Sequence, residues 1–167
     1  MDIDETTYLL HQTPVLLAKR IIDNIEWEVG ECVVEPFKGE GAFYNQLPSN
    51  VIKSYAEIRE GIDFKDINYD NIDTVISNPP FRLNGKNAFS QLVLYFAKTK
   101  IKRLIFLCSS ACYNSLTPTR MHDINSCGLY INKVTTCSVK KWYGRYFVIE
   151  FGRERNIFFN YFLENFD

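Results

Sequence analysis

The stretch Asn78-Pro79-Pro80-Phe81, here called the NPPF segment, carries the side chains of this sequence best suited to chemistry. Asn78 has a side-chain amide oxygen, and Pro79 has a backbone carbonyl but no N–H. Because the two proline rings fix φ near about −65°, the segment holds two hydrogen-bond acceptors in one rigid arrangement. Two adjacent acceptors match an exocyclic NH₂ group, which offers two donors. Phe81 adds a flat face on which a base can stack, worth about 1–3 kcal/mol.

This pair of acceptors can activate an aromatic amine. The lone pair of an aryl amine is delocalised into its ring, so the nitrogen is a poor nucleophile. Acceptance of both of its hydrogens favours a more pyramidal nitrogen and concentrates the lone pair for attack. The alternative is a tight loop that only changes the direction of the chain. The position of the segment directly after the apolar run 72–77 favours the functional interpretation.

Two further clusters point to a bound nucleoside. Gly39-Glu40-Gly41 follows the short β-branched run 32–34, but the third glycine of the dinucleotide fingerprint and the Gly-Lys-Ser/Thr of a phosphate loop are missing. Glu57 comes 22 positions after Glu35, and a carboxylate about 20 residues on suits a grip on two ribose hydroxyls. Taken singly, the glycine pair is as readily a plain turn, and Glu57 a solvated charge.

The sequence pattern alternates strands with helices. We predict helices from Pro14 to before Gly30, at 42–47, at 89–96 and from Thr117 to before Gly128. Strands are predicted at 32–34, 51–56, 72–77 and 104–108, and the alternating runs 134–139 and 146–151 suit a terminal hairpin. This is the pattern of an α/β chain with a mainly parallel sheet. Ligands of such sheets bind beyond the carboxyl ends of the strands, so the three clusters are expected to line one crevice.

Length and composition indicate a single globular domain over residues 1–167. Hydrophobic residues make up 46% of the 167, charged residues 23% and aromatic residues 15%, which excludes a disordered chain. With a formal net charge of −1, the whole chain exerts no general attraction on nucleic acid or membranes, so such contacts need local patches.

The sequence shows no sign of secretion, membrane insertion or metal binding. Its acidic start and the lack of about 18 consecutive apolar residues predict a soluble, intracellular protein of the cytoplasm or nucleus. The five cysteines form no CxxC and have only two histidines to pair with, so we expect structural thiols and no metal.

Together these motifs resemble those of the class I S-adenosylmethionine-dependent amino-methyltransferases, specifically those acting on the exocyclic amine of adenine. Their catalytic motif, Asp/Asn/Ser-Pro-Pro-Tyr/Phe/Trp, stands here as the NPPF segment. Residues 33–43 resemble their cofactor loop, Tyr55-Ala56-Glu57-Ile58 their ribose motif, and Gly61-Ile62-Asp63-Phe64 the segment that contacts the cofactor adenine. Thr13-Pro14 is similar to the Thr-Pro motif of many DNA members. The resemblance runs from about residue 11 to residue 151.

The resemblance implies a Rossmann-like fold, with helices on both faces of a mostly parallel sheet and a C-terminal antiparallel strand pair. It implies S-adenosylmethionine as cofactor and direct in-line transfer of its methyl group to an amine oriented by Asn78 and the Pro79 carbonyl. Glu57 would hold the ribose, and Glu35 stands where the family often has Asp. The implied cofactor contacts are Thr13, Pro14, Glu35, Pro36, Phe37, Gly39, Gly41, Phe43, Glu57, Ile58, Asp63, Phe64 and Asn78.

The sequence leaves the substrate open. DNA is favoured over RNA, yet 167 residues leave no room for a separate target-recognition domain, so a recognition subunit or a homodimer is also compatible. The basic stretch 140–145 supplies candidate substrate contacts in Lys141, Trp142, Tyr143 and Arg145, alongside Phe81. An ordinary hairpin turn explains that stretch equally well. The aromatic tail residues Phe158, Phe159, Tyr161, Phe162 and Phe166 suit either a cover for the sheet or a dimer contact.

Two other functions fit the same motifs. Methylation of a glutamine amide in a protein would use the same two acceptors. A non-catalytic, methyltransferase-like binding subunit would fit the small size of the chain.

Overall fold

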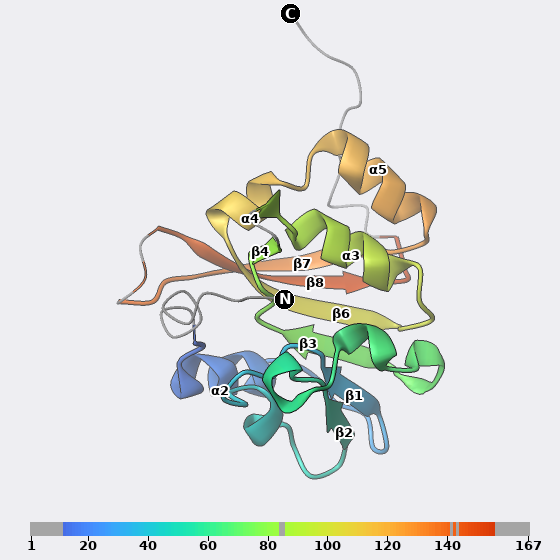
Figure 1. Cartoon of the computed structure of the whole chain (residues 1–167). Helices are drawn as coiled ribbons and strands as arrows, with labels where there is room; N and C mark the ends of the chain where they lie inside the picture. The colour runs from blue at the N-terminus through green and yellow to red at the C-terminus, as the bar shows by residue number, and fades with distance from the viewer. Residues whose placement is uncertain (1–11, 84–85, 141, 143, 156–167) are drawn as a thin grey trace, which may run out of the picture.

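A computed structural model describes residues 12–83, 86–140, 142 and 144–155. Its centre is a six-stranded sheet in the order β2-β1-β3-β6-β8-β7 (Figure 1). β1, β2, β3 and β6 pair in parallel, whereas β8 runs antiparallel to both β6 and β7. The strands are β1 (Cys32–Glu35), β2 (Ile52–Tyr55), β3 (Thr74–Ser77), β6 (Arg103–Ser109), β7 (Tyr130–Cys137) and β8 (Tyr146–Gly152). This confirms the predicted mainly parallel sheet with its C-terminal antiparallel pair.

Helices cover both faces of the sheet (Figure 1). α2 (Val15–Asp23) lies on one face, and α3 (Phe89–Ala97), α4 (Ser110–Asn114) and α5 (Pro118–Ser126) lie on the other. Successive residues of β6 alternate between two cores, because Leu104 and Phe106 pack with α3 and α5 while Ile105 and Leu107 pack with α2. The continuous apolar run of β6 follows from burial on both faces.

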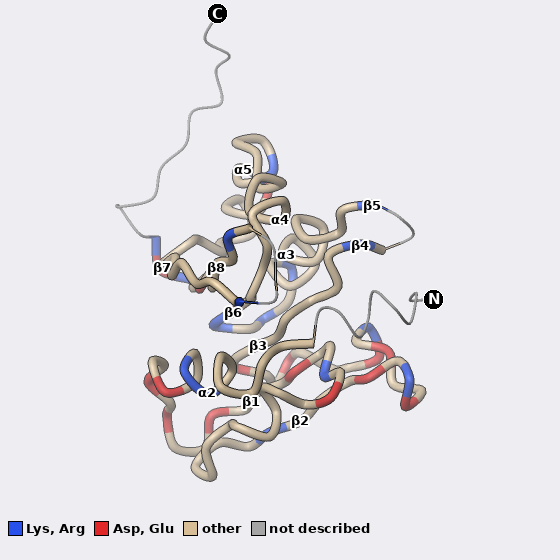
Figure 2. The backbone as a smooth tube through the Cα atoms, turned by 90° about the vertical axis from the view of Figure 1, so that its left-hand side faces the viewer, with Lys and Arg blue, Asp and Glu red and all other residues tan. Residues whose placement is uncertain are grey.

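Short single-turn segments connect these elements. The 3₁₀ turns are η1 (Tyr44–Gln46), η2 (Ile58–Glu60), η3 (Phe64–Asp66) and η4 (Tyr69–Asn71). A small hairpin, β4 (Arg82–Leu83) with β5 (Lys86–Asn87), follows the NPPF segment and stands out to one side of the sheet (Figure 2). No helix among the described residues is long and apolar enough to cross a bilayer.

The strand register brings distant loops to one edge of the sheet. Ser77 at the end of β3 pairs with Phe106, and β6 continues to Ser109, which pairs with Tyr146 of β8. Tyr146 in turn pairs with Cys137 at the end of β7. The NPPF segment after β3 and the loop 138–145 between β7 and β8 therefore lie at the same edge as the ends of β1 and β2. We call this the carboxyl edge.

Several local predictions were incomplete. The first helix ends at Asp23, where the Asn24 N–H bonds to Ile21 O and the Trp27 indole donates to Ile22 O, so the chain turns well before Gly30. The predicted helix at 42–47 is only the 3₁₀ turn η1. α4 was not predicted, and it begins where the Ser109 hydroxyl accepts the N–H of Cys112.

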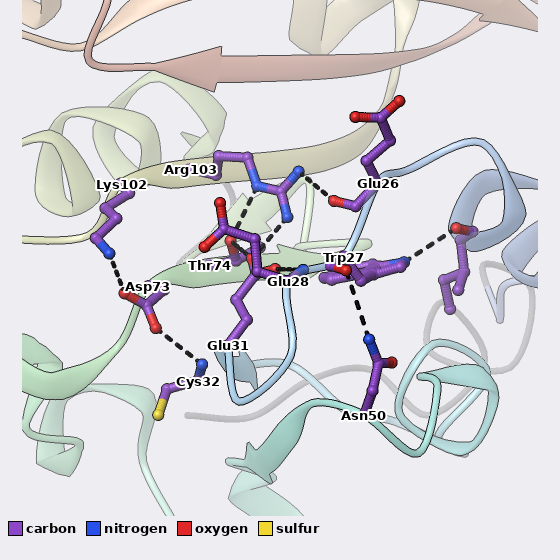
Figure 3. Close-up of polar contacts among 11 residues, drawn as sticks. Glu26, Trp27, Glu28, Glu31, Cys32, Asn50, Asp73, Thr74, Lys102 and Arg103 are labelled. Carbon is purple, nitrogen blue, oxygen red and sulfur yellow. Dashed lines mark hydrogen bonds and ion pairs between the residues drawn. The ribbon is translucent and has the colours of Figure 1, made fainter.

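At the opposite edge a polar network ties the starts of β1, β3 and β6 together (Figure 3). The buried carboxylate of Glu31 accepts hydrogen bonds from the Thr74 hydroxyl at 2.5 Å and from Arg103 Nη2 at 2.6 Å. Arg103 also donates to Thr74 Oγ1 and to the carbonyl of Glu26. Because Arg103 compensates the buried charge of Glu31, the network stabilises the fold only while both partners are present.

We therefore expect Arg103→Ala to lower the free energy of unfolding by about 2–3 kcal/mol, since it leaves the buried Glu31 carboxylate without its cation. Lys19→Ala is the matched control, because it removes a cation from the exposed Lys19–Asp23 pair and should cost no more than about 0.5 kcal/mol. Chemical denaturation measures both changes. Equal losses in the two variants would contradict the assigned role of the network.

Candidate active site

The glycine loop, residues 35–41, makes a tight turn beyond the end of β1. Gly39 and Gly41 have φ values of +53° and +79°, a left-handed conformation that favours glycine. The Gly41 N–H donates to Lys38 O, and its carbonyl accepts the Asn45 N–H, both within 3.0 Å. A Cβ on Gly41 would lie 2.9 Å from Asn45 Nδ2. Gly41 is buried, so its lack of a Cβ leaves room for the Asn45 side chain, whereas the backbone of Gly39 is half-buried.

Glu57, directly after β2, holds the glycine loop in place. Its Oε2 accepts the N–H of Gly39 at 2.7 Å, and its Oε1 accepts the N–H of Arg59 at 3.0 Å, which caps η2. The side chain is buried. Since a carboxylate offers about four lone-pair sites, these two bonds leave acceptor capacity for two ribose hydroxyls.

Glu35 lies beneath the same loop and is almost fully buried. Its Oε2 accepts the N–H of Tyr44 at 2.7 Å. Burial raises the pKa of the Glu35 carboxyl well above its usual value, and this effect outweighs the opposing Tyr44 hydrogen bond and the charge of Lys38. The nearby charge of Glu57 raises the same pKa further.

A second polar cluster at the glycine loop was not predicted. Lys38 Nζ lies 2.5 Å from Glu60 Oε1 and 3.8 Å from the centre of the Tyr55 ring, and the Tyr55 hydroxyl donates to Glu60 Oε2. The hydrogen bond to Glu60 raises the pKa of Lys38. The pairing of Glu35 with Tyr55 across β1 and β2 brings these residues together. The sequence does contain Lys38 in the loop and the spacing Tyr55-x₄-Glu60 at the end of β2. Only the strand register, however, shows that these residues are neighbours.

The segment Gly61-Ile62-Asp63-Phe64 lies against the glycine loop through aromatic contacts. The rings of Phe64 and Phe37 are 4.9 Å apart, and Tyr95 packs on Phe64 at 5.3 Å. Asp63 accepts the N–H of Lys65 and caps η3. Phe64 itself is buried, whereas Ile58 on η2 is exposed.

The start of α2 reaches the glycine loop from the other side. The Gln12 side-chain oxygen accepts the Glu40 N–H at 3.3 Å. Pro14 O begins the helix by accepting the N–H groups of Leu17 and Ala18. The predicted contacts Thr13 and Pro14 therefore lie in the segment that connects the loop to α2.

The NPPF segment is joined to the glycine loop through Ser77, whose hydroxyl donates to Phe37 O at 3.3 Å. Pro79 is buried, and the side-chain oxygen of Asn78 is also out of solvent contact. The carbonyl of Phe81 accepts the N–H of Ala88, which closes the loop around β4 and β5. The half-buried Phe81 ring lies 6.5 Å from that of Tyr146. The segment is therefore fixed at both of its ends.

Not every predicted site residue is available to a ligand. Trp142 is buried and packs on Tyr146 at 4.6 Å, so its ring is a packing group and not an exposed stacking surface. Phe43 belongs to the core beneath α2, so only its backbone is available to a ligand. Arg145 is exposed at the carboxyl edge. Lys141, Tyr143 and the aromatic tail lie outside the described residues.

The cysteines form no reactive centre in the described chain. All five are free, and burial raises the pKa values of the Cys108, Cys112 and Cys137 thiols, which keeps them protonated. No group of three or more His, Cys, Asp or Glu side chains among the described residues is arranged to hold a metal ion.

Solved structures share this fold, although no protein-family model and no curated protein matches the chain. The E. cuniculi Mtq2–Trm112 complex, responsible for methylation of the eRF1 translation termination factor, aligns at 16% identity and a TM-score of 0.57 over 92% of this chain and 98% of that chain. Magnesium protoporphyrin IX methyltransferase (ChlM) from Synechocystis PCC 6803, with bound SAM, aligns at 13% identity and a TM-score of 0.59 over 92% and 87%. A modification subunit of a putative type I restriction enzyme from Vibrio vulnificus YJ016 aligns at 13% identity and a TM-score of 0.54, over 85% of this chain and 44% of that chain. The chain has the Rossmann-like fold of class I methyltransferases.

The pKa of Glu35 makes stability depend on pH. Because its folded-state pKa is raised, its contribution to stability is fully present below the unfolded value of 4.5 and is lost as pH rises through the folded pKa. Gln at this position does not titrate. The unfolding free energy of Glu35→Gln minus that of the parent should therefore rise as the pH increases above 4.5. Denaturation at several pH values, with the exposed Glu26→Gln as control, measures it; a flat difference would contradict the burial effect.

Proposed function

We propose that this chain transfers a methyl group from S-adenosylmethionine to the exocyclic amine of adenine in a nucleic acid, with DNA favoured. One observation carries the proposal. The glycine loop, the Glu57 carboxylate and the NPPF segment meet at the carboxyl edge, joined by the Gly39–Glu57 and Ser77–Phe37 hydrogen bonds. This arrangement supports adjoining sites for a nucleoside cofactor and an acceptor amine at the carboxyl edge.

The residues of the candidate site suit S-adenosylmethionine. The cofactor has no phosphates, which matches a loop without phosphate-binding features, and Gly39 and Gly41 leave room for its methionine part. Glu57 keeps acceptor capacity for the ribose, and Asp63 and Phe64 lie beside the loop where the adenine would bind. When bound, this cofactor supplies an electrophilic methyl group on sulfur. A structural neighbour, ChlM, was solved with SAM bound.

Asn78 and Pro79 orient the acceptor amine. The Asn78 amide oxygen and the Pro79 carbonyl accept its two N–H groups, and Phe81 stacks beneath its ring. Because the Asn78 oxygen is buried, the amine reaches it only after the side chains around it move. Displacement is direct, so the contribution of the chain is positioning, and no covalent intermediate on the enzyme is required.

A second candidate substrate is a glutamine amide in a protein. The observation that favours it is the likeness to Mtq2, which together with Trm112 is responsible for methylation of a translation termination factor. The same likeness favours a partner subunit that presents the substrate. Labelled methyl groups from S-adenosylmethionine, offered with DNA, RNA and protein fractions in parallel, separate the two, and mass spectrometry of the nucleosides identifies N6-methyladenine.

Asn78→Ala should lower the rate of methyl transfer by about 10²-fold or more, because one of the two acceptors that orient the amine is lost. Its affinity for S-adenosylmethionine should change much less, as measured by calorimetry. Asn50→Ala, exposed at the opposite edge, is the control. Intact transfer in Asn78→Ala on every substrate would remove the catalytic assignment.

Glu57→Ala should weaken cofactor binding by about tenfold or more, because a charge-assisted hydrogen bond worth about 1.5–3 kcal/mol is lost and Gly39 is released. Glu57→Gln, which keeps one acceptor, should fall between the parent and the alanine variant. Calorimetry measures the affinities, thermal unfolding checks the fold, and the exposed Glu26→Ala is the control. Unchanged cofactor affinity in Glu57→Ala would exclude the ribose role.

A further inference from the structure

The net charge of −1 conceals a strong asymmetry along the chain. Residues 12–73, which build β1, β2 and the glycine loop, contain 6 Lys and Arg against 12 Asp and Glu, a formal charge of −6. Residues 74–155 contain 13 against 3, a formal charge of +10. Figure 2 shows the acidic segments gathered around β1, β2 and α2, with basic segments on β4 and β5. The NPPF segment lies at the start of the basic half.

Many basic side chains elsewhere in the structure are already neutralised or hydrogen-bonded within the protein. Ion pairs join Lys100 to Asp70, Lys102 to Asp73 and Lys133 to Glu150, besides those of Arg103 and Lys38 already described. The guanidinium group of Arg153 donates to four backbone carbonyls.

Four cations at the carboxyl edge differ from these. Arg82, Lys86, Lys140 and Arg145, here called the basic rim, are exposed, and none of them takes part in an ion pair within the described residues. The sequence places no Asp or Glu in the segments 82–87, 109–114 or 138–146 that form this part of the edge. The rim is therefore a local positive surface, which the described part of the fold does not neutralise.

The basic rim flanks the acceptor site from two chain segments. Arg82 follows Phe81 directly, and Arg145 precedes Tyr146, whose ring lies 6.5 Å from that of Phe81. Both segments rest on α4, because the Asn87 side chain donates to Ala111 O and the Ser110 N–H donates to Arg145 O. A base stacked at Phe81 would thus have cations of the hairpin and of the loop 138–145 beside it.

We propose that the basic rim binds the sugar-phosphate backbone of a single-stranded nucleic acid around the base held at Phe81. This inference rests on the proposed function. A splayed single strand presents unstacked bases and flanking phosphates together, which is what an aromatic ring with neighbouring cations recognises.

A duplex fits this edge less well than a single strand. A paired base must first be flipped out at a cost of a few kcal/mol. The described elements at the edge are a hairpin of two-residue strands, the five-residue α4 and a short loop, and none has the length of a groove-reading helix. The aromatic ring among the cations favours nucleic acid over an acidic peptide.

Paired variants test the surface. Lys86→Ala/Arg145→Ala removes one cation from each segment of the rim, and Lys98→Ala/Arg155→Ala removes the same two charges from exposed positions near the opposite edge. Fluorescence anisotropy measures the affinity for oligonucleotides of about twelve nucleotides, as single-stranded DNA, single-stranded RNA and duplex, at several salt concentrations. The rim variant should bind single strands about tenfold more weakly, and its log–log salt slope should shrink by about 1.4. The control should stay within about twofold of the parent.

Several results would overturn the inference. These are equal losses in the rim and control variants, tighter binding of the duplex than of either single strand, no binding of any oligonucleotide, or displacement of the bound strand by poly-glutamate at equal charge concentration. Cofactor calorimetry and methyl transfer are measured separately on the same proteins. If oligonucleotide binding depends on the rim but no methyl transfer occurs, the binding surface is supported and the proposed activity is wrong. If the rim variant transfers methyl groups with unaltered kinetics, the activity is supported and the binding surface is wrong.

Discussion

The hydrogen bond from the Gly39 amide to the Glu57 carboxylate is the contact on which the carboxyl edge depends. It joins the loop after β1 to the end of β2, and the second oxygen of the same carboxylate starts η2. The Ser77 hydroxyl then connects this loop to the end of β3. Three strand ends are thus held in one arrangement by polar contacts a few ångströms long, and the proposed transfer by positioning would depend on this preorganisation.

Three charged side chains surround the Gly39–Glu57 hydrogen bond, and they differ in burial and in their partners. Glu35 lies beneath the loop with a raised pKa, Lys38 pairs with Glu60, and the charge of Glu57 acts on both Glu35 and Lys38. The ligand-facing side of the loop is consequently backbone and carboxylate, suited to hydroxyl and amine donors. On the other side of Phe81, the segments 82–87, 109–114 and 138–146 contain no Asp or Glu. Under the proposed function, a cationic cofactor and an anionic polymer would each meet complementary charge on its own side.

Local sequence patterns predicted the six strands of the central sheet, although β7 covers Tyr130–Cys137 and not 134–139, and the short strands β4 and β5 were not predicted. The continuous apolar run of β6 is typical of a strand buried on both faces, the alternation of β7 and β8 predicted a terminal hairpin, and the apolar run before the two prolines placed the NPPF segment at a strand end. Contacts between distant segments were beyond such reasoning. The Lys38–Glu60 pair and the Arg103–Glu31 pair join residues 22 and 72 positions apart. The burial of Trp142 also follows from packing against Tyr146, although its neighbours in sequence are basic and polar.

The strand register also shows that the strands end at different levels along the carboxyl edge. β3 ends at Ser77 opposite Phe106, while β6 and its partner β8 continue for three more residue pairs, to Ser109 and Tyr146. At about 3.3 Å per residue, that is a step of about 10 Å. The NPPF segment begins at the lower level, directly after β3, and Tyr146 lies at the upper level, at the start of β8. Because Phe81 follows the shorter strand and Tyr146 belongs to the projecting pair, their rings, 6.5 Å apart, connect the two levels of this edge.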